Sequence, residues 1–323
     1  MNSEYMIPTV TGNIPSNELG ICQVHEHIML RRGIPAQINP VLCMDNEEKS
    51  RKELVDFRWA GGNALVDAQP VGCGRMPAEL SRISRLTGVH IVASTGFYLQ
   101  KFYPDEHWIH TCSEAELEDL FCQELTDSMY QNADRVLGGD KIGQRAGIIK
   151  TALEGGGLTT CQKKLFAAAA RAALICDAPI MIHIEKDSDP LELFTFLVAQ
   201  GVPPNRLIFC HLDRAIPEET VVHQLCREGA YVEHDTIGRF KYHSDEKEIR
   251  LILNLLEAGH QERLLLSLDT TNQRMLSYGG SIGLTYLLNK FWPALRYSGV
   301  SEAVERMIMV ANPARVLGRK ICG

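Results

Sequence analysis

The sequence has no uninterrupted apolar run near the roughly 18 residues that a membrane-spanning helix needs, so we expect no membrane partner. Its first ten residues, MNSEYMIPTV, lack the cationic segment and long apolar core of a secretory signal. No block of lysine or arginine occurs, and the formal net charge of -7 arises from mixed acidic and basic residues. We therefore expect no nucleic-acid partner and a small-molecule substrate.

Cysteine pairs of the Cys-x-x-Cys type are also absent, although the chain has 10 cysteines. Several of these, such as Cys176 and Cys210, lie inside apolar runs, where small buried thiols are common. The pattern predicts neither a disulfide scaffold nor a zinc ribbon. It favours reduced thiols in a cytoplasmic protein.

Internal repeats, low-complexity tracts and linkers are missing, and no Gly-x-Gly-x-x-Gly follows the first apolar run. Short β-branched runs instead alternate with helical patterns such as 162–176 and 248–259. The expected strands cover residues 21–25, 64–68, 90–95, 146–152, 179–184, 206–211, 230–235 and 264–269. Buried parallel strands are near-continuously apolar, so these runs predict an α/β fold, a (β/α)8 TIM barrel, as a single domain over 1–323. An open doubly wound sheet is the alternative.

Polar residues that can bind metals end several of these runs. In a barrel, the carboxyl ends of all strands meet at one face, where active sites form. Each residue also has an ordinary explanation, such as a core histidine, a solvent-reaching lysine or a helix cap. Those explanations would all have to hold at the same end of five strands, so we favour a shared metal site. Its predicted ligands are His25, His27, Lys150, His183, His211 and Asp269.

Neutral imidazole and carboxylate suit Zn²⁺, Mn²⁺ or Co²⁺, and nitrogen ligands favour Zn²⁺. Lys150 is the exception in this set, because an ammonium group repels cations and has no free lone pair. If CO₂ carboxylates the amine, the resulting carbamate has two oxygens that can bridge two ions.

Five segments carry a resemblance to a known family: HEH (25–27), IIKTA (148–152), MIHIE (181–185), FCHLDR (209–214) and LSLDT (266–270). In order and strand placement they resemble the phosphotriesterase family of the amidohydrolase superfamily, across nearly the whole chain. The resemblance implies a barrel with two divalent ions and suggests a homodimer. One ion would be held by His25, His27 and Asp269, and the other by His183 and His211. Carboxylated Lys150 and a hydroxide would bridge them.

A hydroxide between two divalent ions is a nucleophile at neutral pH. We predict that Asp269 accepts its proton during attack on an ester-like bond and delivers that proton to the leaving alkoxide. Asp213, two residues after His211, is a candidate for the next proton acceptor or for an orienting group. An ion pair with Arg214 or a capping role is the alternative for Asp213.

The segments after the last two expected strands contain Arg239, Lys241, Arg274 and Tyr278. Barrels often bind a substrate phosphate with these two loops, and arginine and lysine both suit phosphate. Ordinary solvated surface cations are the alternative. Lys241, Arg274 and Tyr278 resemble the phosphate-holding set of family members that open phosphorylated sugar lactones. A segment similar to the family's TGxY also places Tyr98 near the substrate.

One departure from the family bears on the substrate. Members that hydrolyse organophosphates have a histidine directly after the aspartate of the seventh strand, whereas Thr236 follows Asp235 here. The leading hypothesis is therefore a lactonase in which the bridging hydroxide attacks the carbonyl of a phosphorylated sugar lactone. An organophosphate triesterase or acyl-homoserine lactonase is the second hypothesis, and a catalytically silent ligand-binding barrel is the third.

Overall fold

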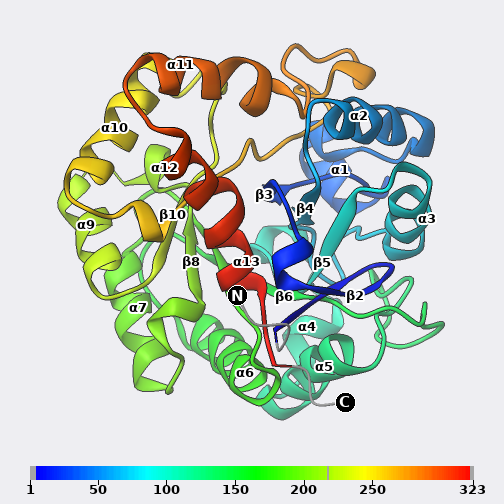
Figure 1. Ribbon diagram of the computed structural model, residues 1–323. Helices are drawn as coiled ribbons and strands as arrows, with labels where there is room; N and C mark the ends of the chain where they lie inside the picture. The colour runs from blue at the N-terminus through cyan, green and yellow to red at the C-terminus, as the bar shows by residue number, and fades with distance from the viewer. Residues whose placement is uncertain (1–4, 217, 321–323) are drawn as a thin grey trace.

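Eight parallel strands form the centre of the computed structural model, which describes residues 5–216 and 218–320 (Figure 1). Strands that neighbour each other in the sheet also follow each other in sequence, so the chain winds once around the barrel. The predicted (β/α)8 fold is confirmed, and each expected range overlaps a strand. The strands are β3 (Cys22–Glu26), β4 (Ala64–Asp67), β5 (His90–Gly96), β6 (Ile148–Leu153), β7 (Ile180–Ile184), β8 (Leu207–Cys210), β9 (Tyr231–His234) and β10 (Leu264–Leu266).

The first and last strands of the barrel meet through residues just beyond β10. The backbone N–H of His25 donates to Ser267 Oγ at 2.9 Å, and the N–H of Asp269 donates to the carbonyl of His25 at 3.1 Å. These bonds bring the carboxyl end of the last strand beside that of the first. Residues from opposite ends of the chain therefore share one face of the barrel.

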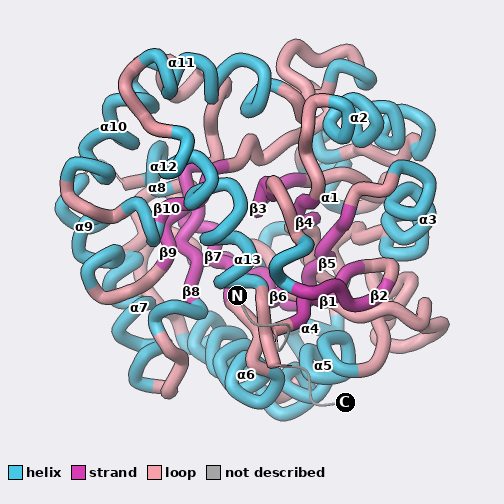
Figure 2. The backbone as a smooth tube through the Cα atoms, in the orientation of Figure 1, coloured by secondary structure: helices cyan, strands magenta, loops and turns pink. Residues whose placement is uncertain are grey.

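Helices surround the strands (Figure 2). The two helical patterns expected from sequence correspond to α6 and α10, which begin after the capping residues Thr159 and Ser244. Gly259, with φ 81°, lies just after the end of α10. The helices are α1 (Ile34–Ile38), α2 (Glu47–Trp59), α3 (Pro77–Thr87), α4 (Trp108–Thr111), α5 (Glu114–Thr126), α6 (Thr160–Cys176), α7 (Pro190–Ala199), α8 (Leu212–Ala215), α9 (Glu219–Arg227), α10 (Asp245–Glu257), α11 (Trp292–Tyr297), α12 (Glu302–Arg306) and α13 (Asn312–Leu317).

Two apolar clusters stabilise the barrel. The larger one lies between the strands and the helices and includes the alanine-rich face of α6. The smaller one contains side chains such as Val24, Val92, Met181 and Leu265 from strands all around the barrel. Because the interior is filled by side chains, the barrel is a packed core rather than a pore. A substrate cavity therefore cannot form inside the barrel itself.

An antiparallel hairpin that the sequence did not predict precedes the barrel. It consists of β1 (Met6–Thr9) and β2 (Gly12–Pro15). Ile7 belongs to the interior cluster, and the N–H of Val10 donates to the carbonyl of Ile91 at the start of β5. The hairpin therefore packs at the amino-terminal end of the barrel, opposite the predicted site. Two prolines and a glycine in so short a segment hide any strand pattern.

The sequence predicted no membrane-spanning helix and no disulfide scaffold. Within the described residues, no helix combines the length and the apolar character that crossing a membrane requires. The nine cysteines in this part of the chain are all free thiols.

Candidate metal centre and substrate cavity

The six predicted ligands lie at the carboxyl ends of the strands, and their exposure ranges from 0% for Lys150 to 8% for His27 and Asp269. His211 and Asp269 have φ angles of 65° and 50°, in the left-handed region. That conformation is costly for residues other than glycine. Backbone hydrogen bonds hold both residues: His211 N–H donates to Asp235 Oδ2, and Asp269 N–H donates to the carbonyl of His25, each at 3.1 Å.

Asp269 lies beside the two histidines at the end of β3. Its Oδ1 is 3.4 Å from His27 Nε2 and 3.8 Å from His25 Nε2. Glu26, between the histidines, points elsewhere and accepts the N–H groups of Leu268 and Thr270 at 2.9 and 3.0 Å, on either side of Asp269. One ligand atom from each of His25, His27 and Asp269 lies within 4.8 Å of the others, close enough to share one divalent ion.

His183 and His211 form the second group. His183 Nδ1 and His211 Nε2 lie 2.8 Å apart, and the hydroxyl of Tyr98 is 3.4 Å from His183 Nδ1. Burial lowers the pKa of His183 to about 4 and holds the pKa of His211 well below its usual value. Both rings are therefore neutral at neutral pH. A neutral ring has the free lone pair that a metal ligand needs.

Lys150 contacts the first group, and its surroundings show whether the site suits the implied ions. Its side chain is fully buried, and its Nζ lies 3.1 Å from His25 Nε2. Among the described residues, no carboxylate forms an ion pair with this amine. A buried ammonium without a counter-charge is strongly unfavourable. A carbamate would replace that positive charge with oxygen ligands, so the surroundings of Lys150 fit a carboxylated lysine between two cations.

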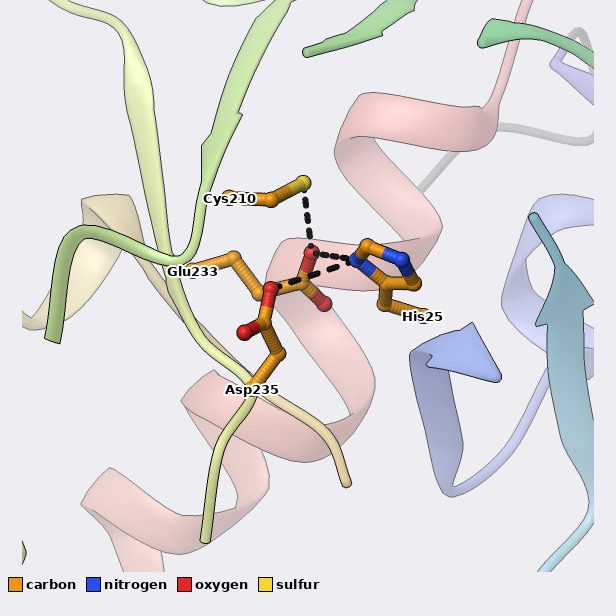
Figure 3. Close-up of side chains that lie close together, drawn as sticks. All are labelled: His25, Cys210, Glu233 and Asp235. Atoms are coloured by element: carbon orange, nitrogen blue, oxygen red, sulfur yellow. Dashed lines mark hydrogen bonds and ion pairs between the residues drawn. The ribbon is translucent and has the colours of Figure 1, made fainter. Parts of the chain in front are cut away.

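Two buried acids, Glu233 and Asp235, lie against the Nδ1 side of the His25 ring; we call them the acidic pair (Figure 3). His25 Nδ1 is 3.4 Å from Glu233 Oε2 and 3.2 Å from Asp235 Oδ2. Asp235 Oδ1 also pairs with His211 Nδ1 at 2.6 Å. Carboxylates at Nδ1 fix the proton there and leave Nε2 free for a metal. The sequence analysis did not assign this role to either acid.

Cys210 and Ser267 hold Glu233 in place. Cys210 Sγ donates to Glu233 Oε2 at 3.1 Å, and Ser267 Oγ donates to Glu233 Oε1 at 2.8 Å. The same serine oxygen accepts the N–H of His25. Glu233 is thus tied through Ser267 to the place where the first and last strands meet.

A cavity of about 480 Å³ opens above the ligands and is lined by His27, His183 and Asp269 on its inner side. Four of the five predicted substrate-binding residues, Tyr98, Arg239, Lys241 and Arg274, also line it. Lys241 is exposed, whereas Arg274 is buried and donates to the carbonyl of Ile237 at 2.6 Å. Burial and the neighbouring Arg239 lower the pKa of Arg274 to about 10, so it stays cationic at neutral pH.

Arg239 contacts one of the predicted ligands, Asp269, directly. Its guanidinium lies 2.9 Å from Asp269 Oδ2 and also donates to the backbone carbonyl of Asp269. Burial alone would raise the pKa of Asp269, but Arg239 and the nearby histidines hold that pKa well below its usual range. Asp269 is therefore ionised, with Oδ1 toward the histidines and Oδ2 toward Arg239.

Two predicted residues take positions away from the cavity. The hydroxyl of Tyr278 contacts Ser50 Oγ at 2.9 Å and donates to the carbonyl of Asn46 at 2.8 Å, so contact with a substrate would require it to leave both. Asp213 Oδ2 accepts the N–H of Thr236 at 3.0 Å and the Thr236 hydroxyl. The predicted roles of Tyr278 and Asp213 stay predictions.

Fold and site together define a class: a (β/α)8 barrel whose strand ends gather imidazoles and a carboxylate suited to divalent ions. The chain belongs to the phosphotriesterase family, which it matches over residues 5–317. It is therefore a hydrolase. This result confirms the family inferred from the five sequence segments.

Relatives of the chain include lactonases. It is 29% identical to a phospho-furanose lactonase of Mycoplasmopsis synoviae, over 96% of this chain and 90% of that protein. The crystal structure of a lactonase from Listeria monocytogenes has a TM-score of 0.86 and 27% identity, covering 97% of this chain and 98% of that one. The phosphotriesterase homology protein of Escherichia coli, complexed with phosphate in its active site, has a TM-score of 0.82 and 28% identity, covering 93% and 99%.

Proposed function

We propose that the protein hydrolyses a phosphorylated sugar lactone with the help of two divalent ions. The observation that carries this proposal is one cavity with cationic Lys241 and Arg274 on its wall and the ligand cluster at its inner side. In a chain with a net charge of -7, such a local excess of cations favours an anionic substrate. The relatives named as lactonases, and the one with phosphate in its active site, support the same substrate class.

The ligands divide between two ions in this proposal. His25, His27 and Asp269 would hold one, His183 and His211 would hold the other, and carboxylated Lys150 would supply oxygen ligands. Zinc suits the imidazole-rich set best, and manganese or cobalt could replace it. Two such ions lower the pKa of water and polarise a carbonyl oxygen.

The residues around the ions handle the proton and orient the substrate. Asp269 takes the proton of the attacking water and passes it to the ring oxygen that leaves as an alkoxide. Because Arg239 keeps the pKa of Asp269 low, this carboxylate holds a proton only briefly. The alkoxide is a much stronger base, so transfer to it is favourable. The Tyr98 hydroxyl, beside His183, contacts the lactone.

A paired screen of phosphorylated and unphosphorylated sugar lactones, with enzyme loaded with zinc or manganese, tests the proposal. Removing one charged contact costs about 1.5–3 kcal/mol, so Lys241→Ala and Arg274→Ala should each raise KM for the phosphorylated lactone about 10–100-fold. The unphosphorylated lactone should be affected far less. Lys163→Ala, which removes an exposed lysine on α6, is the matched control and should change neither value.

Other results would overturn the proposal. If both lactones lost activity equally in the two variants, the cations would not bind phosphate. Efficient turnover of paraoxon or an acyl-homoserine lactone, without turnover of phosphorylated lactones, would identify a hydrolase of neutral esters. Purified protein that binds no metal after growth with zinc and bicarbonate would be a silent barrel.

A further inference from the structure

A separate group of buried polar side chains lies where the residues after β8 meet the start of α10. Asp213 is in α8, His243 is in the loop between β9 and α10, and Glu248 is in the first turn of α10. Their side chains are between 0% and 4% exposed. None of them is among the six predicted ligands. Buried carboxylates and imidazoles need partners, because an unpaired polar group is costly in the interior.

Each of these three residues has one polar atom without a hydrogen bond. Glu248 Oε1 pairs with His234 Nδ1 at 2.5 Å, and Asp213 Oδ2 accepts two hydrogen bonds from Thr236. Asp213 Oδ1, His243 Nε2 and Glu248 Oε2 find no hydrogen-bond partner within the described chain. His243 Nε2 lies 3.0 Å from Glu248 Oε2, but a proton on this nitrogen would not point at that oxygen.

We propose that Asp213, His243 and Glu248 form a third divalent-cation site outside the binuclear centre. His243 Nε2 is 3.0 Å from Glu248 Oε2 and 3.9 Å from Oδ2 of Asp213, the carboxylate whose other oxygen, Oδ1, has no partner, and one ligand atom from each residue lies within 4.8 Å of the others. Ligands about 2.0–2.1 Å from a tetrahedral zinc ion are themselves about 3.3 Å apart, so these spacings need little adjustment. One imidazole and two carboxylates favour zinc or manganese, whereas calcium prefers an all-oxygen site.

The surroundings of this group suit an ion that reaches it from solvent. A cavity of about 220 Å³ adjoins it, lined by Asp213 and His234 together with residues of α9 and α10. His234 holds Oε1 of Glu248 and so orients the carboxylate. Water at an empty site, or an ion pair between protonated His243 and Glu248, are the competing explanations.

An ion at this position would fasten the loop between β9 and α10 to α8 and α10. The same loop presents Arg239 and Lys241 to the substrate cavity. The third ion is therefore a structural ion that holds the loop between β9 and α10 in place. That last consequence rests on the proposed function, whereas the binding of the ion does not.

Counting ions per chain in the purified full-length protein tests the site. Protein stripped with a chelator and reloaded with zinc should hold one ion fewer per chain when it carries His243→Asn. Glu248→Gln, which keeps the shape of the side chain and its contact with His234, should have the same effect if His243→Asn fails to fold. His90→Asn removes a half-buried histidine at the start of β5 and should lose no ion.

A background variant separates this site from the binuclear centre. His25→Asn should lose ions from the main cluster but keep the one that depends on His243. If a third ion is absent, His243→Asn and Glu248→Gln will bind as many ions as the wild type, and the inference is overturned. If the binuclear proposal fails instead, the wild type will hold a single ion that disappears with His243→Asn.

Discussion

Replacing Asp235 with asparagine should weaken both ions of the proposed binuclear centre at once. Asp235 Oδ1 pairs with His211 Nδ1 at 2.6 Å, and Oδ2 lies 3.2 Å from His25 Nδ1. The two histidines belong to different proposed ions. Asparagine keeps the size of the side chain, but it removes the charge and offers a donor where one histidine needs an acceptor. A ring facing that donor would favour the tautomer whose Nε2 is protonated and cannot bind metal.

The size of this effect follows from the contacts. Partners that orient metal-binding histidines typically contribute about 10–100-fold in metal affinity, which is about 1.4–2.7 kcal/mol. Asp235→Asn should therefore weaken each of the two ions by about this factor. Glu233→Gln should weaken only the ion held by His25, because Glu233 contacts that ring at 3.4 Å and Asp235 still supports it. We therefore expect Asp235→Asn to lose affinity for two ions and Glu233→Gln to lose affinity for one.

Competition with a chromophoric zinc chelator measures both affinities. Activity at saturating zinc should return largely to the wild-type level in Glu233→Gln and less completely in Asp235→Asn. Asp45→Asn, which alters an exposed acid paired with Arg32, is the control and should leave zinc affinity unchanged. If Asp235→Asn binds zinc as tightly as the wild type while its thermal unfolding is unchanged, the orienting role of the acidic pair is refuted.

Three more predictions concern the ligand cluster and the fold. Lys150→Met should bind less zinc than the wild type after reloading with zinc and bicarbonate, as metal analysis would show; full binding would exclude a bridging role for Lys150. Arg75→Met breaks a buried two-bond ion pair with Glu124 at 2.5 and 2.7 Å and should lower the unfolding free energy by about 3–5 kcal/mol, measured by urea denaturation. Burial lowers the pKa of His107 from 6.5 to about 4, so the unfolded chain takes up its proton first and stability should fall as pH drops through this window. His107→Gln should flatten that fall relative to the wild type, and equal pH profiles would contradict the assignment.

The strand pattern made the barrel and the position of the ligand cluster predictable. Parallel strands buried on both faces have long apolar runs that stand out from the helices. The polar residue that ends such a run, such as His183 or Lys150, must lie at one face of any barrel these strands form. No knowledge of side-chain packing was needed for this step. The β1–β2 hairpin, which has no comparable run, was missed.

The acidic pair was only partly predictable from the sequence. Glu233 and Asp235 stand two residues apart in AYVEHD, so they share one side of an apolar strand. Two acids on the inward side of a buried strand need cationic or hydrogen-bonded partners. The identity of those partners depends on how β3, β8 and β9 are placed around the barrel. That placement is a property of the closed sheet and cannot be inferred from any one strand.

The loops are the least predictable part of the site, and Asp269 shows why. Its position after β10 could be inferred from sequence, but its pairing with Arg239 could not, because 30 residues separate them and the loop between β9 and α10 has no regular pattern. The pairing matters because Asp269 uses Oδ1 toward the histidines and Oδ2 toward Arg239. One carboxylate therefore joins the strand-end cluster to the loop that lines the cavity. In the proposed mechanism, a change in that loop would alter the pKa of Asp269 as well as the choice of substrate, so substrate preference and proton transfer would be physically coupled in this site.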